Sequence, residues 1–117
     1  MQHVLFYLGL SFILMHEMDA VRCREWRIFP GLSRLDDKTG FAAFMLAHVP
    51  LYVALFWGLT GENSQEVMRG LDLFFIIHLG LHLLFLRHPK NEFKDTLSWA
   101  IIAGAAVCGL ADILTSA

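Results

Sequence analysis

The stretch from Leu71 to Arg87 reads Leu-Asp-Leu-Phe-Phe-Ile-Ile-His-Leu-Gly-Leu-His-Leu-Leu-Phe-Leu-Arg. It is about as long as a membrane-spanning helix, yet it carries His78 and His82 among leucines and phenylalanines. Residues four apart on a helix lie one turn apart on nearly the same face. The pair therefore has the geometry of a metal-chelating or haem-ligating face. The same spacing also suits two histidines hydrogen-bonded to neighbouring helices.

The composition of the whole chain indicates a membrane protein. Of its 117 residues, 56% are hydrophobic and only 17% are charged. This length allows a single domain, residues 1–117, with four spans of about 20 residues each. We therefore predict an all-α polytopic protein in the lipid bilayer, a bundle of four transmembrane helices at about 3–21, 40–59, 67–87 and 96–114. The chain has no nucleic-acid-binding motif, phosphate loop or nucleophile elbow.

The distribution of basic residues predicts the orientation in the membrane. Of the nine Lys and Arg residues, only Arg69 lies outside the first and third loops. The other eight are Arg22, Arg24, Arg27, Arg34, Lys38, Arg87, Lys90 and Lys94. The positive-inside rule then places these two loops in the cytoplasm and both termini outside, in the inner membrane of a bacterium.

Four histidines are expected to lie in one layer near the cytoplasmic side. From the helix rise, His16 and His82 lie roughly 8 Å, and His48 and His78 roughly 13 Å, from the cytoplasmic ends of their spans. Asp19 shares a face with His16 at a spacing of three residues. Another polar group is expected toward the outer leaflet, and it consists of Asp72, Asp112 and His3.

The histidine layer predicts a transition-metal site, with zinc as the expected ion. Neutral imidazoles and a carboxylate are ligands that zinc accepts, and the expected set is His16, His48, His78 and His82. With an open position at the metal, the protein would be a membrane hydrolase that acts on a lipid or other membrane-borne substrate. Glu17 or Asp19 would then accept a proton from the metal-bound water.

Three other interpretations of the same residues stay open. The histidines can be interhelical hydrogen-bonding groups in a structural or partner-binding bundle. His48 and His78, at equal depth on different helices, can ligate haem b, with Gly80 and Gly104 making room for the porphyrin. Asp72 and Asp112 can belong to an ion or proton transport path.

The fourth span is built on small residues at four-residue spacing. They include Ala100, Gly104 and Cys108, and a second row of Ala105 and Gly109. Such a stripe lets helix backbones approach closely in lipid, so we expect it to support close helix packing or a homo-oligomer.

The motif His16-Glu17-Met18-Asp19-Ala20, followed by Trp26 and Pro30, resembles the HXXEE family of small bacterial membrane proteins. The resemblance implies a four-helix protein with a histidine and an acidic pair at the end of its first span. Asp19 stands where the first Glu of the motif would be, and Ala20 replaces the second. The resemblance thus applies to His16 and Asp19 and implies no particular reaction.

The orientation can be tested by labelling single cysteines from the periplasmic side. A cysteine near Glu62 or the C-terminus should react with an impermeant reagent, and a cysteine at Lys90 should not. Labelling of position 90 from outside would contradict the predicted orientation.

Overall fold

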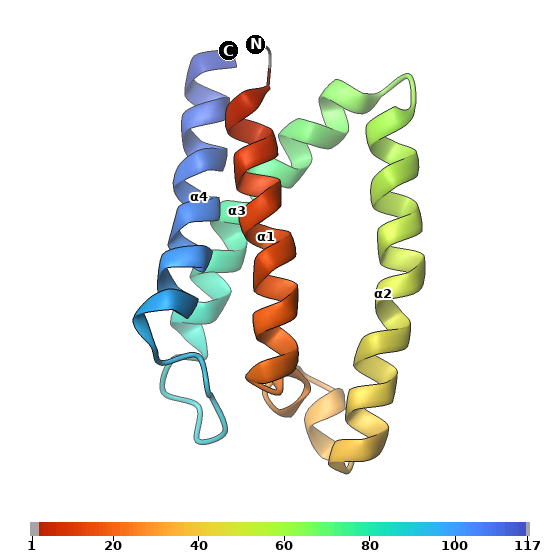
Figure 1. Ribbon diagram of the computed structural model, residues 1–117, viewed down its shortest axis with the longest axis vertical. Helices are drawn as coiled ribbons and strands as arrows, with labels where there is room; N and C mark the ends of the chain where they lie inside the picture. The colour runs from red at the N-terminus through yellow and green to blue at the C-terminus, as the bar shows by residue number, and fades with distance from the viewer. Residues whose placement is uncertain (1–2, 117) are drawn as a thin grey trace.

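Four long helices form the computed structural model of the protein, which describes residues 3–116 (Figure 1). They are α1 (Val4–Arg22), α2 (Asp37–Thr60), α3 (Ser64–Leu84) and α4 (Thr96–Ser116). Each is long and apolar enough to cross a membrane, and the described residues contain no strand. The predicted all-α fold with four candidate transmembrane helices is therefore confirmed.

The two ends of the bundle differ in what they carry. α1 begins and α4 finishes at the same end, beside the turn between α2 and α3 (Figure 1), and we call this the terminal end. The opposite loop end holds two short 3-10 helices, η1 (Glu25–Arg27) and η2 (Leu32–Arg34), and the segment 85–95 that leads into α4. Pro30 and Gly31 lie between η1 and η2.

One buried stripe on α1 and one on α3 decide which side chains point inward. The buried residues of α1 include Phe6, Leu10, Ile13, His16 and Ala20, and those of α3 are Met68, Asp72, Phe75, His78 and His82. The two stripes share the same spacing of four, three, three and four residues, which keeps one face of a helix toward its neighbours. The histidines therefore point inward because they continue an apolar stripe.

Two apolar clusters enclose the level of these histidines. The terminal-end core contains Phe6, Leu10, Ile13, Met68, Phe75 and Ala105. The loop-end core contains Ala20, Cys23, Trp26, Ile28, Phe44, Phe93 and Ile102. Along α1, His16 falls between Ile13 of the first core and Ala20 of the second. A polar layer thus lies between two apolar ones.

α2 is the least packed of the four helices. Its buried residues are Gly40 and Phe44, both in its first third, and Figure 1 shows it standing apart from α1 over most of its length. Asp36 caps its start by accepting a hydrogen bond from the backbone N–H of Thr39 at 3.3 Å. Trp26 packs against Gly40, where an added Cβ would lie 2.7 Å from the indole ring. η1 therefore anchors the beginning of α2.

The small residues of α4 allow it to pack closely against α1 and α3 within the chain. Ala105, Cys108 and Gly109 are buried, and a Cβ added to Gly104 would lie 3.2 Å from the ring of Phe12. A Cβ added to Gly109 would lie 2.7 Å from the carbonyl oxygen of Asp72. The stripe from which we expected a homo-oligomer is therefore largely occupied by the protein's own helices.

Gly109→Ala should destabilise the protein by about 1–3 kcal/mol, because the new methyl group meets the rigid backbone of α3. Gly80→Ala is the matched control, since its Cβ meets nothing within 4 Å. The control should be neutral or stabilising by up to about 1 kcal/mol, the usual helix preference for Ala. Equilibrium unfolding in detergent micelles measures both, and equal effects would contradict the close α3–α4 contact.

Candidate metal centre

Three histidines and one glutamate converge where the two cores meet. His16 comes from α1, His78 and His82 come from α3, and Glu25 comes from η1. One ligand atom from each of these side chains lies within 4.8 Å of the others. Among residues 3–116, this is the group of His, Cys, Asp and Glu donors with metal-binding spacing.

The four side chains lie close together and are shielded from solvent. The ring centroid of His16 lies 4.4 Å from that of His78 and 4.8 Å from that of His82. The Glu25 carboxylate approaches Nε2 of His16 at 3.6 Å and Nε2 of His82 at 3.7 Å. His16 has no exposed surface, His78 and His82 are 7% and 5% exposed, and the Glu25 side chain is 16% exposed.

Several polar atoms of the group have no hydrogen-bond partner within the described chain. They are both ring nitrogens of His16 and Nδ1 of His78. A buried polar atom without a partner costs about 1–3 kcal/mol. The approaches of Glu25 to the histidines exceed hydrogen-bond length, so the carboxylate does not satisfy these atoms. The group therefore contains ring nitrogens that could bind a ligand, because no hydrogen bond within the group satisfies them.

Glu25 enters the group because the chain reverses directly after α1. The helix ends at Arg22, and Arg24 adopts a left-handed conformation with φ 51° and ψ 52°. That conformation is unusual for a residue with a Cβ. It starts η1 directly after the end of α1 and places Glu25 beside His16 and His82. No periodic pattern marks such a turn, and sequence reasoning missed this residue.

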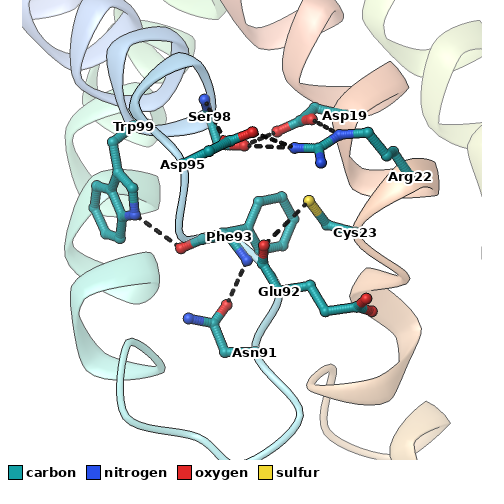
Figure 2. Close-up of polar contacts among 9 residues, drawn as sticks. All are labelled: Asp19, Arg22, Cys23, Asn91, Glu92, Phe93, Asp95, Ser98 and Trp99. Carbon is teal, nitrogen blue, oxygen red and sulfur yellow. Dashed lines mark hydrogen bonds and ion pairs between the residues drawn. The ribbon is translucent and has the colours of Figure 1, made fainter.

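Phe93 covers the histidines from the loop end. It is fully buried, stacks on the His16 ring at 5.3 Å and meets the His82 ring edge-on at 4.6 Å. Its backbone is fixed on both sides, as Figure 2 shows. Its N–H donates to Asn91 Oδ1 at 3.1 Å, and its carbonyl accepts from Trp99 Nε1 at 2.8 Å. The segment before α4 thus closes the centre.

Asp19, expected to act at the metal site, instead joins α1 to α4. Its carboxylate accepts from Arg22 Nε at 2.8 Å and from the hydroxyl of Ser98, which is fully buried (Figure 2). The guanidinium of Arg22 also donates to Asp95 at 3.1 Å and to Ser98 Oγ at 3.0 Å. Hydrogen bonding by Ser98 keeps the pKa of the exposed Asp95 carboxyl below its usual range. We call these four residues the clamp.

Cys23 adds a further contact between the two loops. Its thiol donates to the carbonyl oxygen of Glu92 at 3.6 Å (Figure 2). Burial raises the pKa of this thiol to about 11, so it stays protonated at neutral pH. Cys23 therefore acts as a hydrogen-bond donor in the support of the centre.

His48 and Glu17 form a separate pair on the side of α1 that faces α2. Glu17 bonds His48 Nε2, and His48 Nδ1 bonds the carbonyl oxygen of Phe44 at 2.7 Å. Both line a cavity of 190 Å³ with Tyr52 and the apolar side chains of Leu14, Met18, Val21, Phe44 and Met45. The structure thus brings together three of the four histidines predicted as ligands, while His48 and both expected catalytic carboxylates lie outside the group.

The remaining two histidines lie outside the group. His3 precedes α1 at the terminal end, where it bonds the side chain of Gln65 at 3.1 Å. His88 lies in the segment before α4 and accepts from the backbone N–H of Lys90 at 3.1 Å. His3 was expected away from the histidine layer, in the outer polar group.

The fold and the site together define a small multi-pass membrane protein with a buried histidine–carboxylate centre. The chain belongs to the family of unknown function DUF6713, whose profile matches residues 2–117. The match names a family other than HXXEE, so the resemblance to HXXEE proteins is one of motif and architecture. Comparison with curated proteins and with solved structures returned no match.

Ser98→Ala should destabilise the protein by about 1–3 kcal/mol, because it removes a buried donor to Asp19 and a buried acceptor from Arg22. Ser11→Ala is the control, since this exposed hydroxyl bonds only within its own helix, to Tyr7 O at 2.7 Å. Its effect should stay within about 0.5 kcal/mol. The measurement is the unfolding free energy of each variant in detergent. Equal losses of stability in the two variants would contradict the clamp.

Proposed function

We propose that the protein is an integral membrane metal-binding protein that holds one transition-metal ion, with zinc as the expected ion, through His16, His78, His82 and Glu25. The observation that carries the proposal is the set of unpaired ring nitrogens on His16 and His78. They are buried beside a carboxylate and a third imidazole. A bound cation would supply the partner that these atoms lack.

The spacing of the donors is compatible with a tetrahedral ion after a small contraction. Zinc–nitrogen and zinc–oxygen bonds of about 2.0–2.2 Å place neighbouring ligand atoms about 3.3–3.6 Å apart. The donors here lie within 4.8 Å of one another. Rotation of the imidazoles and of the longer Glu25 side chain can close that difference without moving a helix. The proposed site needs no rearrangement of the fold.

The donor set favours zinc and its neighbours in the transition series. Imidazole suits zinc, copper, iron and nickel, whereas magnesium and calcium prefer sites made entirely of oxygen ligands. Four protein ligands close a tetrahedron and correspond to a structural zinc site. Such an ion would cross-link α1, α3 and η1 at the loop end, which we expect on the cytoplasmic side from the distribution of basic residues.

A metal-dependent hydrolase is the second candidate, and the position of Glu25 favours it. Glu25 is the most exposed of the four donors and the only one on a short loop helix. If it left the ion, three histidines and a water molecule would remain, which is the composition of a catalytic zinc site. Glu25 would then be placed to accept a proton from that water. The substrate would be a lipid or another molecule that enters from the bilayer.

Haem b remains a cofactor to be tested against zinc. A bis-histidine haem would need a free ring nitrogen on His48 as well as on His78. Both ring nitrogens of His48 are already bonded, to Phe44 and to Glu17. The pattern of free nitrogens therefore supports a metal ion at the His16 group over a haem between α2 and α3.

Elemental analysis and an absorption spectrum of the purified protein test the proposal. We expect about one zinc or related ion per chain and no Soret band. His78→Ala and His82→Ala should each reduce affinity at least tenfold. If the ion has four protein ligands, Glu25→Gln should weaken metal binding. If the protein is a hydrolase with three histidine ligands, Glu25→Gln should retain the metal and lose catalytic turnover. Loading to one hundred times Kd should stabilise the wild type by about 2.7 kcal/mol and the histidine variants much less.

The controls are histidines that lie outside the group. His88→Ala and His3→Ala should retain the full metal content, and so should His48→Ala if Glu25 is the fourth ligand. Since imidazole must be deprotonated to bind, protons compete with the metal for the ring nitrogens, and affinity should fall on acidification. Equal loss from His88→Ala and His78→Ala would mean adventitious binding, and the proposal would fail.

A further inference from the structure

A second polar site lies at the terminal end of the bundle, separate from the histidine group. A cavity of 670 Å³ opens there between the start of α1, the first half of α3 and the end of α4. Its polar lining consists of His3, Gln65, Glu66, Arg69, Asp72, Asp112, Thr115 and Ser116. The volume falls within the range of small-molecule sites, about 300–1,000 Å³.

The charge of the lining is dominated by carboxylates. Glu66, Asp72 and Asp112 face a single guanidinium, that of Arg69, among the described lining residues. Glu66 and Arg69 are exposed, whereas Asp72 and Asp112 are buried. The wall of the cavity therefore presents acidic groups at its buried side, where charge interactions are strongest.

Asp72 is held at the cavity without a partner for one of its oxygens. It is 2% exposed, and its Oδ1 has no hydrogen-bond partner among the described residues. The backbone of Asp72 lies in close contact with Gly109, which holds Asp72 against α4. Gly109 precedes Asp112 by three residues along α4, so the two aspartates lie near each other. A buried carboxylate in an apolar bundle is costly unless a cation or hydrogen-bond donor satisfies it.

The chemistry of the lining favours an organic cation over a metal ion. The described residues place no third His, Cys, Asp or Glu donor at metal-binding spacing with the two aspartates. The volume also far exceeds the share of one water molecule, about 30 Å³. A primary ammonium group has three donors and one positive charge, which match carboxylate oxygens on one side of a roomy cavity.

We propose that this cavity binds a primary ammonium group, with Asp72 and Asp112 as its anionic partners. From the helix rise, Asp112 lies about 6 Å and Asp72 about 12 Å from the terminal-end limits of their helices. The cavity therefore opens near the level of lipid headgroups. The ammonium group belongs either to a free amine or to the headgroup of an aminophospholipid, and the two sources share the same recognition chemistry.

The test uses the full-length protein in nanodiscs of phosphatidylglycerol, which carries no amine. One arm titrates ethanolamine by calorimetry, and the other measures retention of phosphatidylethanolamine by native mass spectrometry after it is added to the nanodiscs. Saturable binding of ethanolamine identifies a free amine, and selective retention of phosphatidylethanolamine identifies the lipid headgroup. Either result supports the proposal, and binding of neither probe overturns it.

Asp72→Asn should weaken the observed binding at least tenfold, and Asp112→Asn should also weaken it. Glu62→Gln is the matched control, because this exposed residue lies at the same end of the molecule but outside the cavity. The control should bind like the wild type. In amine-free lipid, Asp72→Asn should also raise the melting temperature, because it replaces a buried acidic group with a neutral amide. Undiminished binding by both aspartate variants would overturn the proposal.

Metal content of the same samples keeps this result separate from the histidine centre. Asp72→Asn should retain the metal content of the wild type, which shows that the bundle is folded. A variant that lost both metal and amine binding would be discounted as misfolded, and Asp112→Asn would then decide the outcome.

Discussion

The cost of burying polar side chains in an apolar bundle is the constraint on which this structure depends. Water is not available inside such a bundle, so every buried donor or acceptor needs a partner from the protein or from a ligand. The clamp of Asp19, Arg22, Asp95 and Ser98 meets this requirement with protein groups alone. His16, His78 and Asp72 do not. Among residues 3–116, the buried side-chain nitrogen and oxygen atoms without a hydrogen-bond partner belong to these two proposed sites.

The packing of three helices makes both sites rigid. α4 approaches α1 and α3 closely because its small residues leave room for the neighbouring side chains and backbone. Close-packed protein interiors tolerate little movement, so this helix packing holds the histidines of α1 and α3 in their relative positions. α2 has a different role, because most of its surface faces away from the other helices. Its contribution near α1 is the His48–Glu17 pair.

The sequence alone was sufficient for the fold and for most of the histidine group. The four apolar segments predicted four helices, and the stripe that carries His78 and His82 predicted an inward-facing pair. The depth of each residue in its span, estimated from the helix rise, then placed His16 at the same level. It also brought His48 there, because depth says nothing about the direction of a side chain around its helix. The Glu17–His48 pair depends on how α2 is rotated against α1, and Glu25 depends on a left-handed turn at Arg24. Neither feature follows from periodicity.

The short helix η1 connects the histidine group to the start of α2. Glu25 belongs to the histidine group, and the next residue, Trp26, packs on Gly40 and donates to Asp37 at the start of α2. Adjacent residues of one helical turn cannot move independently. A movement of the η1 backbone that carried Glu25 toward or away from the histidines would therefore also move the base of α2. The least packed helix is thereby mechanically linked to the chemistry of the most buried residues, and the linkage runs through a single peptide bond.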